Sequence, residues 1–163
     1  RHATESAPQS AYAWRVLGTR LLRWGRARDA VPALERAAEL APEHAETWNG
    51  LGLARYDGGD VEGAERAFRR GIELHPEHSG LRLGLAALLV NAHRFAEALA
   101  VYDDVVARTP TFAPAHVGRA ILLHELGRPD DAEAAFARAV EVARDPEPYR
   151  RRLEEYRRLR ARD

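Results

Sequence analysis

Apolar residues recur along this chain with the three-to-four-residue spacing of amphipathic helices, and polar turns separate the helical segments. In residues 45–78 two such segments, AETWNGLGLARY and VEGAERAFRRGIEL, flank a polar run that contains two glycines. Glycine in this run is expected to end the first helix, and Asp60 is placed to cap the second. Matching turns hold Gly25, His93 and Gly127. The pattern predicts an all-α chain of helix pairs.

The helix pairs repeat with a period of 34 residues. Positions in register are Pro42, Pro76 and Pro110; Ala30, Ala64, Ala98 and Ala132; and Leu34, Phe68, Tyr102 and Phe136. Four units therefore fill residues 11–44, 45–78, 79–112 and 113–146. Repetition at such a period is typical of a solenoid, in which each unit buries its apolar face against its neighbours.

The two ends of the chain differ from the repeats. Residues 1–10 have no apolar core and are expected to form a flexible leader. Asp145-Pro146, at the end of the fourth unit, favours the start of another helix. In that helix Tyr149, Leu153 and Tyr156 form one apolar stripe, and the other faces are charged. We therefore expect residues 147–163 to form a capping helix on the fourth unit.

The repeated residues resemble those of a known family. The motif consists of Trp14-x2-Leu17-Gly18 and Trp48-x2-Leu51-Gly52, followed by Ala30/Leu34/Pro42 and Ala64/Phe68/Pro76. This pattern resembles the tetratricopeptide repeat (TPR), and the resemblance covers the four units from residue 11 to residue 146. It implies a right-handed α-solenoid of helix-turn-helix repeats, in which small residues let the two helices approach and large residues fill the gaps between units.

Several positions depart from the family pattern. Arg82 and His116 stand in place of the tryptophan, and Arg119 and Arg144 stand in place of the core leucine and the closing proline. Four side chains occupy positions that are usually packed in the family: Arg55, Arg82, His116 and Arg119. Either the arginine stems extend to water, or the side chains gather around a bound anion or a buried acid.

Composition removes several classes of function. The chain carries 25 basic and 25 acidic residues and no cysteine, so its net charge is zero and disulfides and thiolate sites are excluded. A neutral chain is not drawn as a whole to nucleic acid or to an anionic membrane. The longest apolar run, Leu85–Val90, is far shorter than the roughly 18 residues of a membrane span, so no membrane insertion is expected.

Catalytic and metal-binding patterns are weak. His75 and His78 are close in sequence, but both fall in a turn between repeats, where duplication of Pro-Glu-His accounts for them. His116 and His124 are eight residues apart and therefore about 80° from alignment on a helix. The adjacent carboxylates Asp103-Asp104 and Asp130-Asp131 would point in different directions on a helix, so neither pair is expected to form a catalytic acid and base. We therefore expect no catalytic residue, no metal, no cofactor and no enzyme activity, and no small-molecule substrate.

The family resemblance implies a function in binding. In TPR proteins the first helix of each repeat lines a concave groove that binds peptides or helices of other proteins. The residues expected to contact a partner are Arg15, Thr19, Arg23, Asn49, Leu53, Tyr56, Leu83, Ala87, Val90, Val117, Ile121 and His124. Most of the middle and far positions are apolar, which predicts an amphipathic helix or an extended apolar peptide as ligand, with an acidic group near Arg15 or Arg23.

Three alternatives remain open at the sequence level. The apolar stripe could be covered by the chain's own leader or cap, or by a second copy through self-association. The array could be a targeting or regulatory domain of a larger enzyme or complex. The arginines of residues 150–163 could bind an anion or RNA, although Glu-to-Arg pairs such as Glu154–Arg158 favour a charged outer face of the cap.

Overall fold

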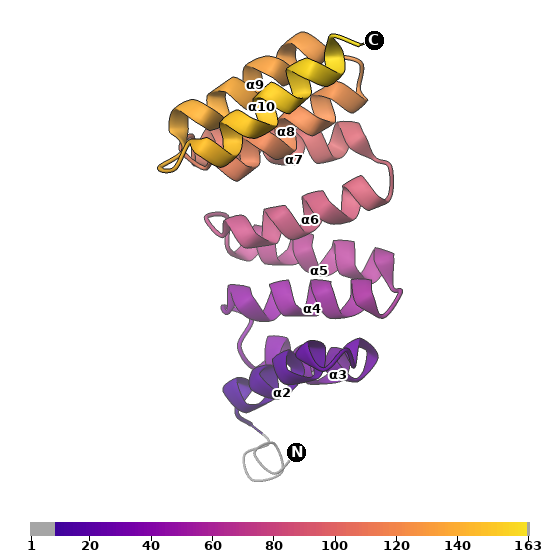
Figure 1. Cartoon of the computed structure of the whole chain (residues 1–163). Coiled ribbons are helices and arrows are strands. Elements are labelled where there is room, and N and C mark those ends of the chain that lie inside the picture. Colours follow the sequence, from indigo (N-terminus) through magenta and orange to yellow (C-terminus); the bar gives the residue numbers. More distant parts are fainter. Residues whose placement is uncertain (1–8, 163) are drawn as a thin grey trace. The chain divides into compact units, whose positions relative to one another are not determined.

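The computed structural model describes residues 9–162, so eight of the ten residues of the predicted leader lie outside the described part. Within that part the chain forms nine α-helices and no strand (Figure 1). The helices are α2 (Ala11–Arg23), α3 (Ala27–Leu40), α4 (Ala45–Asp57), α5 (Val61–Leu74), α6 (Ser79–Asn91), α7 (Phe95–Arg108), α8 (Ala113–Glu125), α9 (Pro129–Val142) and α10 (Glu147–Arg160). The helix-pair prediction is confirmed. We call α2, α4, α6 and α8 the A helices and their partners α3, α5, α7 and α9 the B helices.

Local signals place the turns within the pairs. Gly25, Gly59 and Gly127 have φ angles of 70°, 91° and 72°, and His93 adopts the same left-handed backbone at 56°. A residue without a Cβ atom enters this conformation without steric cost, which is why glycine ends most of these A helices. Asp60 caps α5 as predicted, since its Oδ1 accepts a hydrogen bond from Gly63 N–H at 2.9 Å.

The helix that contains Pro32 begins earlier than its sequence indicates. A proline that early in a helix suggests a start near Asp29, yet α3 begins at Ala27. The amide of Ala30 donates to the carbonyl of Arg26 at 3.1 Å, so the first turn closes before the proline is reached. Pro32 has no backbone N–H, so the helix loses only one hydrogen bond at this position.

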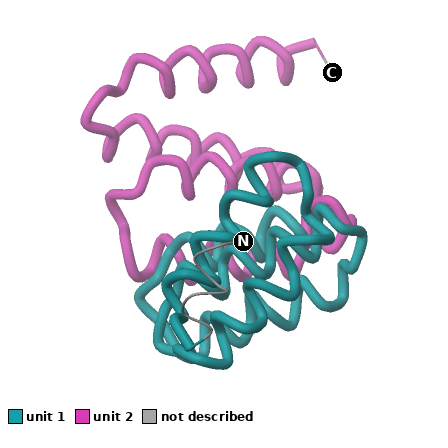
Figure 2. Tube along the Cα trace, turned by 90° about the horizontal axis from the view of Figure 1, so that it is seen from below, with its two compact units in different colours: residues 1–88 teal, residues 89–163 magenta. Residues whose placement is uncertain are grey.

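The chain divides into two compact units, residues 1–88 and 89–163 (Figure 2). In the first unit α3 packs against both α2 and α4, and α4 packs against α5. Close approach depends on glycine: a Cβ atom at Gly18 would lie 2.5 Å from Leu34 Cγ, and one at Gly52 would lie 2.6 Å from the Phe68 ring. The small-against-large pairing of the repeats is therefore a direct contact.

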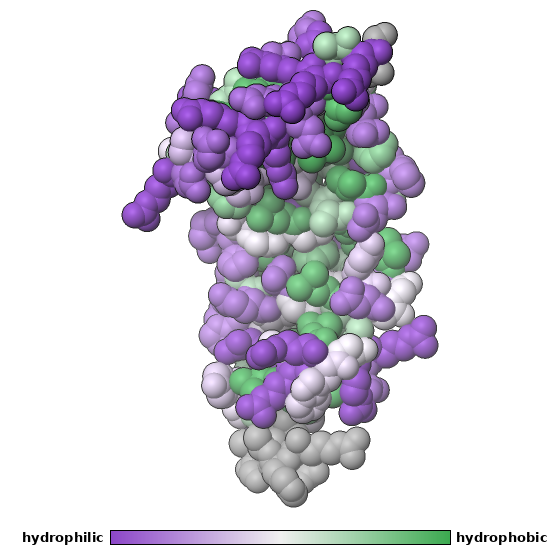
Figure 3. All heavy atoms as spheres, viewed as in Figure 1, coloured by the Kyte–Doolittle hydropathy of each residue, from purple (hydrophilic) through white to green (hydrophobic). Residues whose placement is uncertain are grey.

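In the second unit α8 packs against α7 and α9, and α10 packs against α9. Leu153 of α10 is buried, and the Tyr156 ring lies 5.0 Å from the Phe136 ring, so the predicted apolar stripe is the packed side of this helix. The helix starts at Glu147, whose amide donates to Asp145 Oδ1 at 3.3 Å. Hydrophilic residues dominate the surface over α10 (Figure 3).

No helix within residues 9–162 combines the length and the apolar character that a membrane crossing requires.

Candidate functional site

The A helices expose one residue at the same place in every repeat. The ninth residues of the four repeats are all exposed: Thr19, Leu53, Ala87 and Ile121. Two of them are large and apolar, Leu53 at 41% exposure and Ile121 at 47%. The residue one position earlier is buried in each case. In the first two repeats it is a glycine that lies against the B helix. Each A helix therefore has a packed side and an open side, and we call the open side its A face.

The A face of α2 is basic and aromatic. The Arg15 guanidinium lies 5.4 Å from the centre of the Tyr12 ring, within reach of a cation–π interaction. The Thr19 hydroxyl donates to the carbonyl of Arg15 at 2.9 Å, and Arg23 is exposed in the last turn. Because α2 carries three arginines and no acidic residue, its A face is positively charged.

The A faces of α4 and of the part of α6 in the first unit are less polar. Leu53 is exposed, Asn49, Tyr56 and Leu83 are half-buried, and Ala87 is exposed. Since α2 also contacts α4, the basic face of one helix lies beside the more apolar face of the next. The first unit therefore brings together a positive charge and an exposed leucine.

In the second unit one expected contact residue is covered. Val117 is only 4% exposed. It lines a small cleft of about 290 Å³ together with Pro114 and with Pro148, Tyr149 and Arg152 at the start of α10. Val117 therefore differs from the exposed stripe expected from the sequence, while Val90 is half-buried.

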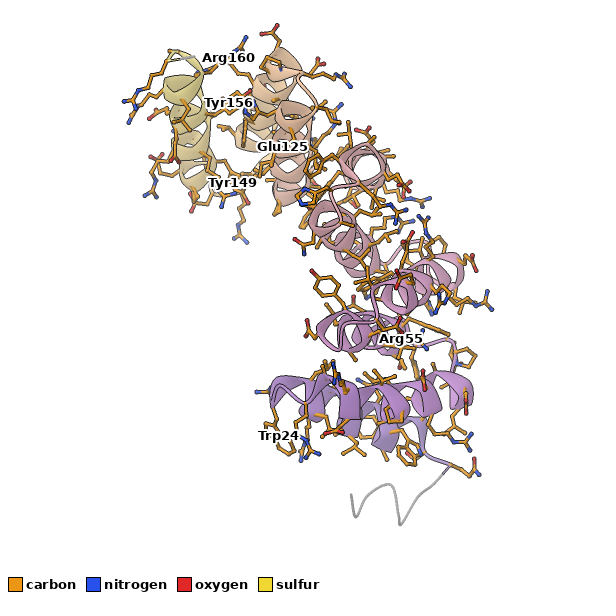
Figure 4. The ribbon with its side chains drawn as sticks, turned by 90° about the vertical axis from the view of Figure 1, so that its right-hand side faces the viewer. Trp24, Arg55, Glu125, Tyr149, Tyr156 and Arg160 are labelled. Carbon is orange, nitrogen blue, oxygen red and sulfur yellow. The ribbon has the colours of Figure 1, made fainter. Side chains whose placement is uncertain are left out.

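His124 is exposed, and α10 reaches it. The Tyr156 ring meets the His124 imidazole edge-on at 5.5 Å, and its hydroxyl lies 3.3 Å from His124 Nδ1 and 3.2 Å from the carbonyl of Pro129. The carbonyl can only accept, so the hydroxyl donates to Pro129 and accepts from His124. Tyr156 and Arg160 project from α10 toward the neighbouring helices (Figure 4).

Ionic contacts hold α10 in this position. Arg157 Nε lies 2.7 Å from Glu133 Oε1, Arg160 Nη1 lies 3.1 Å from Glu133 Oε2, and Arg160 also pairs with Asp130. The Glu154–Arg158 pair is present at 3.6 Å. Arg150 also lies 3.5 Å from Glu147. Four of the C-terminal arginines are therefore paired with carboxylates of the chain. This pairing does not favour an anion or RNA site.

Two of the arginines at packed positions each meet an acid of their own unit. Arg55 Nη2 lies 2.6 Å from Glu35 Oε1 in the first unit, and Arg119 Nε lies 2.6 Å from Asp103 Oδ1 in the second. Arg82 is buried. Arg55 and Arg119 therefore meet separate acids of the chain, so the hypothesis of a shared anion gains no support.

The histidines of the turn between the second and third repeats each lie near a single carboxylate. His78 Nε2 lies 3.9 Å from Glu46 Oε1, and His75 Nδ1 lies 4.0 Å from Glu77 Oε1. Within residues 9–162 no group of three or more histidine, cysteine, aspartate or glutamate side chains is arranged to hold a metal ion.

Comparison with protein families gives a consistent result. Two tetratricopeptide repeat models match the sequence, one over residues 15–79 and the other over residues 56–111 and 89–162. No curated protein sequence matches the chain.

Solved structures share the fold. A crystal structure of MamA superposes with a TM-score of 0.78 at 22% identity, over 85% of this chain and 81% of that one. MamA from Desulfovibrio magneticus RS-1, from residue 41 to the end, gives 0.76 at 25% identity over 93% and 85%. TTC0263, a thermophilic TPR protein of Thermus thermophilus, gives 0.67 at 26% identity over 90% and 81%. The prediction of an all-α solenoid of helical repeats is confirmed.

Proposed function

The chain belongs to the tetratricopeptide repeat family, and we propose that its A faces hold a helix or an extended segment of another protein. Proteins of this fold are in general interaction modules rather than enzymes. The observation that carries the proposal is the exposure of Leu53 and Ile121 at the same repeat position. Single exposed apolar residues are common, but recurrence at one repeat position favours a contact surface, and covering one such side chain contributes about 1.5–3 kcal/mol.

The charge of the first unit indicates what kind of partner its A faces would bind. Arg15 and Arg23 lie on a helix without acidic residues, beside the helix that exposes Leu53. A partner with an apolar residue over Leu53 and a carboxylate near Arg15 or Arg23 satisfies both features. The charge pair would act mainly on partner choice and association rate, and the apolar contact mainly on affinity.

Affinity capture with matched variants tests this function. Leu53→Glu and Ile121→Glu place a charge on each A face, and Val61→Glu places the same charge on the exposed start of a B helix. Val117 is unsuitable for this experiment, because a charge at a buried position would unfold the chain. Circular dichroism first establishes that all three variants are folded.

We expect a partner that the parent and Val61→Glu retain and that at least one A-face variant loses. Equal capture by all four proteins would overturn the proposal. Raising the salt concentration separates it from the RNA alternative, since binding through many phosphates weakens steeply with salt and apolar binding does not.

A further inference from the structure

The first helix pair carries a second open surface, away from the A faces. An open cleft of about 760 Å³ lies between α2 and α3. Its apolar lining consists of Trp14, Leu17, Leu21, Trp24, Pro32 and Ala33. Trp24 is 67% exposed, and Figure 4 shows it on the side of the first helix pair that is turned away from Arg55. We call this surface the end cleft.

The repeat itself shows what kind of element fits such a surface. Leu17, Leu21 and Trp24 occupy the repeat positions that Leu51, Arg55 and Gly58 hold in α4. In α4 these positions face α3 and are covered by it. Leu51 shares one apolar core with Leu34, Arg55 pairs with Glu35 at 2.6 Å, and the carbonyl of Gly58 accepts from Arg28 Nε at 3.2 Å.

On the equivalent side of α2, Leu21 is buried in the core of the first unit, whereas Leu17 is half-buried and Trp24 is exposed. Only residues of α2, of α3 and of the turn between them line the end cleft. The packing of α3 on α4 is therefore an internal template for one further helix on α2. Because the exposed Trp24 follows α2 where Gly58 follows α4, such a helix would meet a large apolar side chain that α3 does not meet.

Charge selects among the possible helices. The end cleft is bordered by Arg26, Arg28 and Arg36 and by one acid, Asp29. Arg26 pairs with Asp29 at 2.6 Å and Arg36 with Glu39 at 2.9 Å, both exposed pairs that contribute little. Three arginines against one aspartate give the cleft an excess of positive charge.

Charge does not favour a second copy stacked end to end. Helix α10 would be the opposite end of such a stack, and it carries six arginines against three glutamates. Its neighbouring carboxylates Asp130 and Glu133 are already paired with Arg157 and Arg160, so this end offers little negative charge to the arginines of the cleft. An acidic helix is attracted, and exposed tryptophan beside arginine is the composition found at the centres of protein interfaces.

We propose that the end cleft is a docking site for an acidic amphipathic helix of another protein, held as α4 is held by α3. Its apolar side chains pack on Trp14, Leu17 and Trp24, and its carboxylates face the bordering arginines. Trp24 is the anchor of this contact. The site is separate from the A faces, so a partner bound there leaves the proposed ligand site open.

A peptide probe can be taken from the chain's own template. The probe is a hydrocarbon-stapled, fluorescein-labelled copy of residues 27–40 with the changes R28E, E35L and R36E, which make the helix acidic and extend its apolar side. The staple is needed because a helix of 14 residues is marginal in water. The comparison peptide carries E35L alone and keeps both arginines.

Fluorescence anisotropy with the full chain measures the docking. We expect the acidic probe to bind at least ten-fold more tightly than the comparison peptide. Trp24→Glu should weaken the acidic probe at least ten-fold. Tyr12→Glu changes an aromatic residue of nearly equal exposure, 68%, on the A face and should leave binding unchanged. Leu53→Glu should also leave it unchanged, which separates this result from failure of the A-face proposal.

Several outcomes would overturn the inference. One is equal binding of the two peptides, and another is equal loss in Trp24→Glu and Tyr12→Glu. Self-association that Trp24→Glu abolishes, seen by sedimentation velocity, would assign the cleft to a second copy. Binding that occurs only in a variant without residues 1–8 would assign it to the chain's own first residues.

Discussion

His116 donates a hydrogen bond from Nε2 to the main-chain carbonyl of Pro110 at 2.8 Å, and two repeats earlier Trp48 makes the same bond from Nε1 to Pro42 at 2.8 Å. A carbonyl can only accept, so His116 must carry hydrogen on Nε2. The histidine is smaller than the tryptophan that the family has at this position, but its ring N–H makes the same hydrogen bond as the N–H of the indole. In both repeats the bond ties an A helix to the loop that precedes it.

His116→Phe is expected to lower the free energy of unfolding by about 1–2 kcal/mol, because the buried ring remains but the Pro110 carbonyl loses its donor. Urea denaturation followed by circular dichroism measures the change. Trp48→Phe removes the same bond in the first unit and should act in the same direction. An unchanged midpoint in His116→Phe would show that the bond adds nothing to stability.

The contact between Gly52 and Phe68 gives a second prediction. A Cβ atom at Gly52 would lie 2.6 Å from the Phe68 ring, so Gly52→Ala forces the two helices apart and should cost about 1–3 kcal/mol. Gly50→Ala is the matched control in the same helix, since its nearest neighbour, Leu34 Cδ2, is 3.4 Å away. The control should be neutral or slightly stabilising, because alanine favours helix over glycine. Thermal unfolding of the two variants distinguishes these effects, and equal losses would refute the contact argument.

Local features of the fold could be predicted from the sequence. Asp60 caps α5 and Gly59 turns the backbone because both effects depend on residues only a few positions apart. The 34-residue register extends the same inference, since a contact such as Gly52 with Phe68 is repeated as Gly18 with Leu34. Period and cap chemistry together are therefore enough to place the helices.

Parts of the candidate site could not be predicted in this way. His124 and Tyr156 are 32 residues apart, and they meet only because α10 packs beside α9. The cover over Val117 has the same origin, since Tyr149 and Arg152 line its cleft. A rule that assigns surface residues by repeat position assumes a neighbouring repeat, and α10 is a single helix with different side chains.

Thr47 provides a third prediction, because its hydroxyl is buried without a partner. The side chain is 1% exposed, and its Oγ1 has no hydrogen-bond partner within residues 9–162. Thr47→Val keeps the shape and removes the unpaired group, so it should raise stability by about 1 kcal/mol. The control is Thr19→Val, whose hydroxyl is exposed and donates to Arg15, and which should not stabilise. A lower melting temperature for Thr47→Val would mean that the hydroxyl is satisfied in solution.

His93 supplies a fourth prediction through its backbone. Its φ of 56° is left-handed, whereas the other three turns use glycine there. His93→Gly should raise stability by about 0.5–1 kcal/mol, since relief of the left-handed strain exceeds the added freedom of the unfolded chain. His93→Ala keeps the Cβ atom and loses the edge contact with Phe95 at 5.6 Å, so it should not stabilise. If glycine and alanine give the same melting temperature, backbone strain is not the cause.

The fifth prediction concerns alkaline pH. Burial raises the pKa of the Tyr102 phenol above its ordinary value of 10.0. The folded chain then holds this proton more tightly than the unfolded chain does, so the associated stability is complete below pH 10 and is lost as the pH rises through the folded pKa. The Tyr102→Phe variant has no ionisable hydroxyl at this position, so its stability does not depend on this ionisation. We expect the urea midpoint of the parent to fall more steeply between pH 9.5 and about 11 than that of the variant. At pH 8 the two proteins should differ little, and parallel curves across the whole range would show that Tyr102 ionises as readily in the folded chain as in the unfolded one.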